Sequence, residues 1–321
     1  MTSLVSTIIP VYNRASLLKE AVASALSQTY PHIEIIIVDD GSADDTSLVA
    51  DDLSRIHADR VTVIHQTNTG PGLAREAGRR RARGEFIQYL DSDDLLLPRK
   101  FELQVAGLKA HPACAVSYGK TRFYKRGSEI TDVAWKRTGE IIPAMFPSFL
   151  ESRWWGTSTP LYRRNVIDSA GPWKALSTEE DWEYDCRIAT QDISLHYLPE
   201  FVSEEREHNE SRLSRDGNKL QSKLKDRATA HELILAHALT AGITVETPEM
   251  KAFARELFLL SRQCGAAGLA AESKQLFGYA KQASGQVRGE KLDFKLYELL
   301  AKVTGWRALG TIACYADNLR K

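Results

Sequence analysis

Short apolar runs alternate with amphipathic segments along the first 110 residues. Four of these runs have the length and the β-branched or aromatic content of buried strands, namely residues 4–9, 34–38, 61–65 and 86–90. The segments between them, such as residues 18–26, repeat apolar side chains at helical spacing. Strands and helices that alternate in this way predict a mostly parallel, Rossmann-like sheet with helices on both faces.

Polar loops follow each predicted strand. They are Tyr12-Asn13, Asp39-Asp40 and residues 68–72 and 91–94. Because the carboxyl ends of parallel strands meet at one edge of a sheet, where open α/β sheets bind ligands, we expect these loops to converge. Ser42 and Asp45 are also spaced as a helix-start signal for a helix that reaches residue 56.

Three carboxylates crowd the last of these loops. Asp91, Asp93 and Asp94 follow the apolar run 86–90 within four positions, and Pro98 then starts a helix. Carboxylates this close repel one another, and a divalent cation that prefers oxygen ligands is one reason to tolerate them. A turn ahead of a helix is the structural alternative, because Asp and Ser are common turn residues.

The pattern changes after residue 113. Short strands are predicted at 115–118, 121–124 and 193–198 and a helix at 179–189, whereas residues 204–215 are too polar for a core and predict a loop or flap. Helices dominate the remainder, at 248–264, 269–283, 292–303 and 306–319. We therefore predict an α/β domain over residues 1–216 and a C-terminal all-helical domain over residues 217–321.

Composition excludes several classes. Lys plus Arg and Asp plus Glu both number 42, so no net field favours nucleic acid. The four cysteines form no C-x-x-C pair, which disfavours disulfides and structural zinc. The first residues lack the basic and long apolar regions typical of a signal peptide, and no apolar run approaches the ~20 residues that span a bilayer. A cytoplasmic protein, at most peripheral at the inner face of the membrane, is predicted.

Motif order carries a family resemblance. The segments are Ile9-Pro-Val-Tyr-Asn13, Val38-Asp-Asp-Gly-Ser42, Asn68-x-Gly70 with Ala74-Arg75 and Gly78, Gly84-Glu-Phe-Ile87, Leu90-Asp-Ser-Asp-Asp94 and Glu180-Asp-Trp182. Together they closely resemble the inverting family-two glycosyltransferases, which have a GT-A fold. Neither G-x-G-x-x-G after the first strand nor a P-loop is present, so the dinucleotide-binding and P-loop versions of the architecture are disfavoured.

The resemblance implies roles for individual residues. A donor site is implied, in which Pro10, Tyr12 and Asp39 hold the nucleotide base, Arg75 supports the nucleotide, and Asn13, Asp91 and Ser92 complete the binding loops. For the metal, Mn²⁺ or Mg²⁺, it implies Asp93 as the direct ligand with Asp91 and His208 as further contacts. Asp181 matches the general base. Glu76 departs from the Asn that more commonly follows the arginine.

The chemistry asks for such groups independently of any family. Loss of a nucleoside diphosphate builds charge that a carboxylate-bound divalent cation neutralises, and the attacking hydroxyl needs a separate base. Alternatives stay open at three places. Thr178-x-x-Asp181 also fits a capping box, His208 fits a solvated loop histidine, and Trp154 and Trp155 fit either an acceptor platform or buried aromatics.

The leading interpretation is a metal-dependent inverting hexosyltransferase. It would move a sugar from a nucleoside diphosphate sugar, with a UDP-sugar favoured, to a hydroxyl of a glycan or lipid-linked acceptor in bacterial-type surface polysaccharide, lipopolysaccharide or glycoconjugate synthesis. A sugar nucleotidyltransferase and a noncatalytic nucleotide-sugar-binding protein are the alternatives. Trp306, Leu309, Ile312, Ala313 and Leu319 share a face of the last predicted helix, which suits packing, a partner subunit or a membrane surface.

Overall fold

The computed structural model describes residues 3–125, 132–207 and 221–319. It divides into two compact units that interleave along the chain. The first consists of residues 1–144, 153–176 and 191–210, and the second of residues 145–152, 177–190 and 211–321. The boundary predicted at 216/217 lies outside the described residues. Two segments that precede it, 145–152 and 177–190, nonetheless belong to the helical unit.

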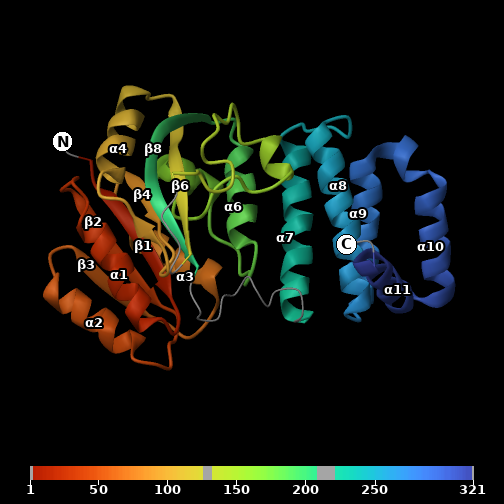
Figure 1. The fold of residues 1–321 in the computed structure, drawn as a ribbon, viewed down its shortest axis with the longest axis horizontal. Coiled ribbons are helices and arrows are strands. Elements are labelled where there is room, and N and C mark those ends of the chain that lie inside the picture. Colours follow the sequence, from red (N-terminus) through yellow and green to blue (C-terminus); the bar gives the residue numbers. More distant parts are fainter. Residues whose placement is uncertain (1–2, 126–131, 208–220, 320–321) are drawn as a thin grey trace. The chain divides into compact units, whose positions relative to one another are not determined.

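The first unit is built on a mixed sheet with helices on both faces (Figure 1). Among the described residues its strand order is β3-β2-β1-β4-β7-β6-β8-β5. The strands are β1 (Val5–Val11), β2 (Ile33–Asp39), β3 (Val61–His65), β4 (Phe86–Tyr89), β5 (Leu95–Leu96), β6 (Cys114–Lys125), β7 (Leu161–Arg163) and β8 (Ser194–Glu207). The four strands expected at the start, β1 to β4, pair in parallel as predicted. Strand β7 then joins β4 in antiparallel orientation.

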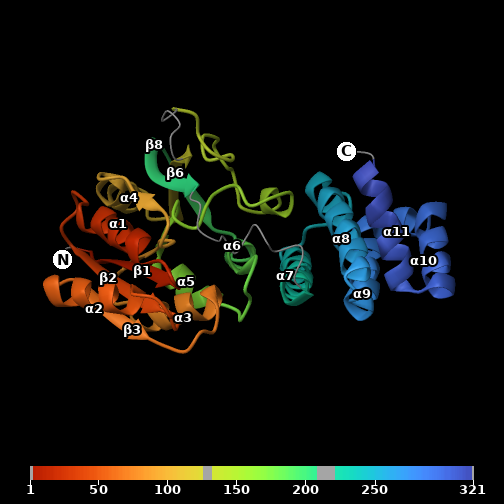
Figure 2. The ribbon, with the colours of Figure 1, turned by 60° about the horizontal axis from the view of Figure 1, so that its bottom comes forward.

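Alternating side chains of the parallel strands pack on different helices. Val5 and Ile9 of β1 belong to one core with α1 (Ala15–Leu26), α2 (Thr46–Ile56) and α4 (Lys100–Ala110). Ile8 lies on the other face, where α3 (Pro71–Arg81) approaches so closely that a Cβ on Gly78 would lie 2.4 Å from its Cγ2 atom. Figure 2 shows α1 and α3 separated by the strands. A short helix, α5 (Arg164–Ala170), follows β7.

Two local predictions were wrong. Residues 204–207 are strand rather than loop, because β8 pairs with β6 and β5 along this stretch and buries Ser203 and Glu204 despite their polarity. Residues 208–215 of the predicted flap lie outside the described residues. Ser42 does not cap α2, whose N-cap is Asp45. The Ser42 hydroxyl instead accepts a hydrogen bond from the backbone N–H of Asn13.

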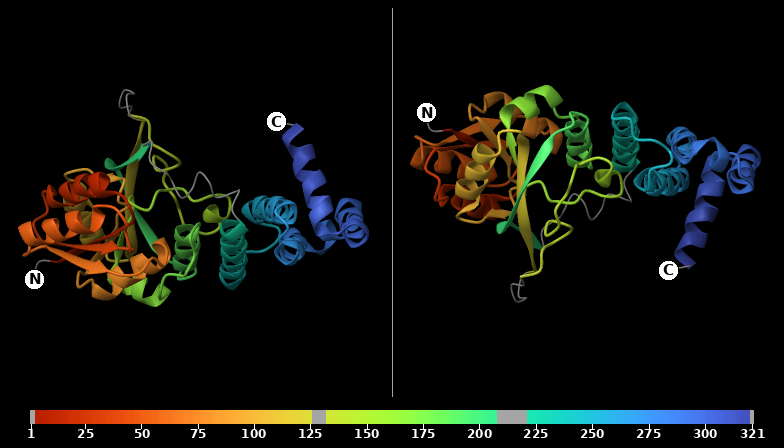
Figure 3. Two further views of the ribbon diagram at one scale, coloured as in Figure 1. Left: turned by 90° about the horizontal axis from the view of Figure 1, so that it is seen from below. Right: turned by 90° about the horizontal axis from the view of Figure 1, so that it is seen from above.

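The second unit is helical. Its helices are α6 (Glu180–Ala189), α7 (Gln221–Thr240), α8 (Pro248–Ala266), α9 (Ala270–Gly289), α10 (Leu292–Thr304) and α11 (Trp306–Leu319), with a 3-10 turn at Ser148–Leu150. Figure 3 shows α8 and α9 packed side by side. Helix α11 crosses α8 where Gly310 meets Gly265. A Cβ on Gly310 would lie only 2.7 Å from the backbone nitrogen of Ala266, so the close approach requires glycine.

The predicted apolar face of the last helix is used in part inside this unit. Trp306 packs on the rings of Phe277 and Tyr297, and Leu309 is buried. Ile312 is 62% exposed, so this part of the apolar face is not covered by the other helices of the unit. The Leu319 side chain lies outside the described part. No helix that the structure describes is long and apolar enough to cross a membrane.

Candidate donor site and candidate general base

The loops after β1 and β2 are tied to each other. Asn13 adopts a left-handed backbone conformation, with φ of 51°, and its side-chain oxygen accepts the N–H of Ala43 at 2.7 Å. Its own N–H donates to the hydroxyl of Ser42 at 2.9 Å. Pro10 lies within β1 beside Val38 of β2. These contacts leave Tyr12, 46% exposed, as a large aromatic surface at the sheet edge.

Asp39 ends β2 with a buried carboxylate. One oxygen accepts the N–H of Ser42 at 3.1 Å, and the other accepts the hydroxyl of Ser47 and lies 3.1 Å from Nδ1 of His65. Burial alone would raise the pKa of Asp39, but these hydrogen bonds outweigh it and lower the pKa. The group is therefore an oriented anion.

Asp40, the next residue, has a structural role. Its carboxylate accepts the N–H groups of Thr69 at 2.9 Å and Gly70 at 2.8 Å, together with the side-chain amide of Gln66 at 2.7 Å. It thereby anchors the loop after β3 to the end of β2, directly before α3. Helix α3 carries Arg75.

The acidic turn after β4 is paired with arginines. Arg75 donates to Asp91 at 2.6 Å and lies over the ring of Trp173, with 5.0 Å between guanidinium carbon and ring centroid. Arg14 donates to Asp93 at 2.9 Å. Both carboxylates of the predicted motif thus stand at the carboxyl edge of the parallel sheet, each beside a cation. Ser92, between them, is buried.

Asp94 completes the turn from the inside. Its backbone N–H donates to the carbonyl of Asp91, and its buried carboxyl accepts the hydroxyl of Ser158 at 2.8 Å. Burial raises the pKa of Asp94 well above its usual value, and the nearby charges of Glu205, Asp93 and Asp91 raise it further. The turn is therefore a place of concentrated negative charge that two arginines only partly offset.

Asp181 lies in the second unit, at the start of α6. The helix begins at Glu180, its N-cap is Glu179, and no side-chain hydrogen bond comes from that N-cap. The capping box with Thr178 as N-cap is therefore not formed. The half-buried Asp181 carboxylate itself accepts the N–H of Trp182 at 2.7 Å. A position in the first turn favours an ionised carboxylate, because the helix dipole is positive there.

The family follows from a comparison with known proteins. The profile described as "Glycosyl transferase family 2" matches residues 6–164, a stretch that contains the whole of the site described in the first unit apart from Trp173 and Glu205. These residues form a glycosyl transferase family 2 domain. The resemblance inferred from the motifs is thereby confirmed.

Curated relatives share this family 2 region. The chain is 37% identical over 129 residues to the uncharacterized glycosyltransferase EpsJ of Bacillus subtilis, covering 40% of this chain and 36% of that protein. It is 32% identical over 173 residues to the putative glycosyltransferase EpsH of the same organism, covering 52% and 49%. A glycosyltransferase of Rickettsia typhi, described as uncharacterized, is 46% identical over 102 residues. The match with that protein spans 32% of this chain and 31% of the relative, so the likeness covers about a third to a half of these relatives.

Solved structures show the same fold over almost the entire chain. TarS of S. aureus, residues 1–349 in complex with UDP-GlcNAc, has a TM-score of 0.69 at 19% identity and covers 96% of this chain and 88% of that one. The mannosyltransferase PcManGT of Pyrobaculum calidifontis, in complex with GDP-Man and Mn²⁺, has a TM-score of 0.54 at 18% identity, with 99% and 88% covered. The predicted GT-A fold followed by C-terminal helices is confirmed.

The carboxylates of the acidic turn are suited to a divalent cation that is also coordinated by a nucleotide's phosphate groups. Among the described residues, no three His, Cys, Asp or Glu side chains group closely enough to enclose a metal ion. Mg²⁺ in nucleotide sites commonly takes only one or two carboxylates and completes its shell with phosphate oxygens and water, and Mn²⁺ suits the same oxygen ligands. Asp91 and Asp93 would be the two carboxylates of such a site. His208, the third predicted metal contact, lies outside the described residues.

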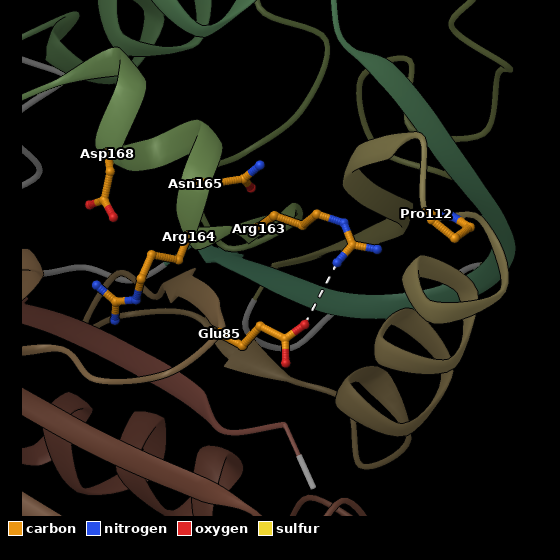
Figure 4. A pocket seen from close by; sticks show the side chains of 6 residues that line it. All are labelled: Glu85, Pro112, Arg163, Arg164, Asn165 and Asp168. Carbon is orange, nitrogen blue, oxygen red and sulfur yellow. Dashed lines mark ion pairs between the residues drawn. The ribbon is translucent and has the colours of Figure 1, made fainter. Parts of the chain in front are cut away.

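A separate hollow occupies the opposite edge of the family 2 domain's sheet (Figure 4). It measures about 460 Å³ and is lined by Glu85, Pro112, Arg163, Arg164, Asn165 and Asp168. Glu85 precedes β4, so the hollow lies at the amino end of that strand, away from the acidic turn. Its arginines serve the fold, since Arg163 donates to the carbonyls of Cys114 and Leu108. None of the predicted site residues lines it.

Sequence reasoning missed several members of the site. Arg14 comes directly after the Tyr12-Asn13 motif, and its basic character was the available signal. Ser158, Trp173 and Glu205 reach the acidic turn or its arginine from distant parts of the sequence, and no local pattern indicated them. Trp154 and Trp155 are buried, which settles their alternative in favour of aromatic core residues.

Proposed function

We propose that the protein is an inverting glycosyltransferase that moves a sugar from a nucleoside diphosphate sugar to an acceptor hydroxyl. One observation supports this above others: a family 2 domain brings Asp91 and Asp93 to the carboxyl edge of its parallel sheet, each beside an arginine. The sheet edge also carries the exposed ring of Tyr12 and the oriented anion of Asp39.

The donor would be held by groups of complementary chemistry. Tyr12 offers a ring face for stacking on the base, and Asp39 offers an acceptor for a ring N–H. We favour uridine as the base; TarS, of the same fold, has been solved with UDP-GlcNAc. Arg14 and Arg75 place positive charge beside the position proposed for the diphosphate. A Mn²⁺ or Mg²⁺ ion held by Asp93 and Asp91 would supply Lewis-acid neutralisation of the leaving diphosphate.

Asp181 is the proposed general base. An inverting transfer is a single displacement, so the acceptor hydroxyl must lose its proton while its oxygen attacks the anomeric carbon. The oxygen–carbon bond forms as the carbon–phosphate oxygen bond breaks, and the proton passes to the carboxylate. Asp181 is suited to this because its place in the first turn of α6 favours the ionised form.

The biological setting is proposed more broadly. EpsJ and EpsH are relatives from a bacterium, and we infer a cytoplasmic role in surface polysaccharide, lipopolysaccharide or glycoconjugate synthesis. The acceptor would be a glycan or a lipid-linked hydroxyl compound. Exposed apolar residues of the C-terminal helices, including Leu296, Leu299 and Ile312, offer a surface for peripheral membrane contact.

The decisive experiment screens nucleotide sugars. Thermal unfolding of the protein would be followed with UDP-, dTDP- and GDP-sugars, each with Mn²⁺ and with a chelator. A true donor should raise the melting temperature. At a ligand concentration of a hundred times its Kd, it should add about 2.7 kcal/mol to the free energy of unfolding. Release of the nucleoside diphosphate on addition of acceptor should follow. Stabilisation by a nucleoside triphosphate and sugar phosphate, with pyrophosphate as the product, would instead establish the nucleotidyltransferase.

A further inference from the structure

The segment that carries Asp181 is fastened to helix α7 at three successive points, all within the second unit. The first point precedes α6. Ser177 donates both its backbone N–H, at 2.9 Å, and its hydroxyl to the same carboxylate oxygen of Asp226. Asp226 lies in the second turn of α7. The chain therefore enters α6 from a fixed position.

Glu179 makes the second attachment. It is the N-cap of α6 and adopts a left-handed conformation, with φ of 58°, which a glutamate rarely takes without compensation. Its carboxylate receives the guanidinium of Arg227 at 2.7 Å and lies 3.0 Å from Nδ1 of His231. Burial would raise the pKa of Glu179, but the charges and hydrogen bonds of His231 and Arg227 prevail and lower the pKa. Glu179 is thus held as an anion.

His231 is itself enclosed. It is fully buried. The ring of Phe253 on α8 stacks on it at 5.4 Å between centroids, and the ring of Trp182 on α6 meets it edge-on, also at 5.4 Å. Nδ1 also lies 2.9 Å from the carbonyl of Arg227. An imidazole packed against two aromatic rings in this way has little freedom, so it gives Glu179 a rigid partner.

Glu183 makes the third attachment, one helical turn further. Its buried carboxylate lies 2.9 Å from Nε2 of His237 on α7 and receives Arg187 of its own helix. Glu179 and Glu183 thus both bond to side chains of α7. Asp181 lies two positions before Glu183 in α6, and residues two apart do not share a helix face, so Asp181 projects in another direction. Figure 1 shows the two helices alongside one another.

We propose that α7 is the positioning element of the general base, and that Glu179, Arg227 and His231 are its positioning residues. This rests on the proposed function of Asp181. It assigns the start of the C-terminal helical region a part in catalysis, whereas the sequence had indicated only packing or docking. The fixed entry of α6 orients the Asp181 carboxylate toward the acceptor, and a displacement of about 1 Å in a reacting group can cost about 100-fold in rate.

Glu179→Gln tests the proposal, with Glu232→Gln as the matched control. Glu232 lies on the same helix α7 but receives Tyr279 and Gln275 of α9 rather than any residue of α6. We expect Glu179→Gln to lower kcat by about 10–100-fold while the KM for the donor stays near the wild-type value. Glu232→Gln should leave kcat unchanged even if it lowers the melting temperature equally. Equal kcat losses in the two variants would overturn the proposal.

Hydrogen exchange tests the attachment of α6 to α7 independently of the proposed glycosyltransferase function. Amides of residues 177–190 should exchange faster in Glu179→Gln than in the wild type or in Glu232→Gln, and this can be measured without any substrate. If no nucleotide sugar is turned over by the wild type, the function fails while the exchange result still reports on the attachment. Unchanged exchange in Glu179→Gln would refute the attachment itself. Ser177→Ala, which removes only one hydroxyl, gives the same readout should Glu179→Gln not fold.

Discussion

Two regions of this molecule crowd carboxylates in a short stretch of chain, with opposite electrostatic outcomes. In the turn after β4, burial and the neighbouring acids raise the pKa of Asp94 well above its usual value. At the start of α6, the pKa values of Glu179 and Glu183 are lowered despite burial, because each carboxylate has its own histidine and arginine. The pKa values of crowded carboxyl groups therefore shift in opposite directions, depending on whether cationic side chains lie beside them.

The difference indicates which region needs a ligand. Glu179 and Glu183 are each paired with an arginine and a histidine of the protein, which is what a scaffold requires. In the acidic turn Arg14 and Arg75 offset the charges of Asp93 and Asp91. The third carboxylate, Asp94, is buried beside these acids. A divalent cation would relieve this repulsion, so the turn is suited to binding, whereas the α6 cluster is suited to holding something in place.

The largest effect is expected from Asp181→Asn. Asparagine keeps the size and can still accept the N–H of Trp182, but it cannot take up a proton. Transfer should slow by ~10²–10⁴-fold, the contribution typical of a general base. The affinity for donor and metal should stay near normal, and steady-state kinetics with titration calorimetry would show both. Near-normal turnover with the true acceptor would move the base to another residue, with Glu180 as the next candidate.

Asp93→Asn should produce the next largest effect, confined to the acidic turn. The substitution removes the proposed metal ligand and leaves Arg14 without this carboxylate. Outer-shell partners of metal ligands typically contribute about 10–100-fold to metal affinity, and a direct ligand should contribute at least as much. Calorimetry with a nucleoside diphosphate should show that Mn²⁺ no longer strengthens binding. Unchanged binding in Mn²⁺, with turnover intact, would refute the metal assignment.

The sequence predicted the frame of the site because that frame is local. Strands β1 to β4, the loops at their carboxyl ends and the Asp91-Asp93 motif all follow from runs of fewer than ten residues. Their convergence follows from the geometry of parallel sheets. The family resemblance assigned expected roles to these positions. The family profile over residues 6–164 confirms the resemblance itself.

What the sequence could not supply depends on contacts between distant residues. Ser158 reaches Asp94 across 64 positions, and Arg206 of β8 donates to the carbonyl of Asp93 across 113. The polar stretch 204–207 was mistaken for loop for the same reason. Its strand partners lie far away in the sequence, and cross-strand pairing overrides local composition. The pKa values depend on these long-range neighbours and could not be read from spacing.

Glu183→Gln tests the scaffold side of the comparison and should mainly affect stability. The variant leaves Arg187 and His237 beside a neutral amide in a buried place, at a cost of about 1–3 kcal/mol in the free energy of unfolding. Because the folded-state pKa of Glu183 is lowered, its stabilisation is present above the unfolded pKa and is lost as pH falls through the folded pKa. Denaturant titrations at pH 7 and pH 4 should show the variant's deficit shrinking in acid. A deficit independent of pH would mean that the charge of Glu183 is not what joins the helices.

Asp94→Asn should have the smallest effect and the opposite sign. The folded-state pKa of Asp94 is raised, so the wild type is most favoured below the unfolded pKa and loses that advantage as pH rises through the folded pKa. Asparagine does not titrate and can still accept the hydroxyl of Ser158. In a chelator, at a pH above the folded pKa, the variant should therefore gain on the order of 0.5–1 kcal/mol, about the value of one hydrogen bond. The gain should fade toward pH 4. Destabilisation at neutral pH would show instead that the ionised Asp94 carboxylate is compensated, and that the acidic turn resembles the α6 cluster after all.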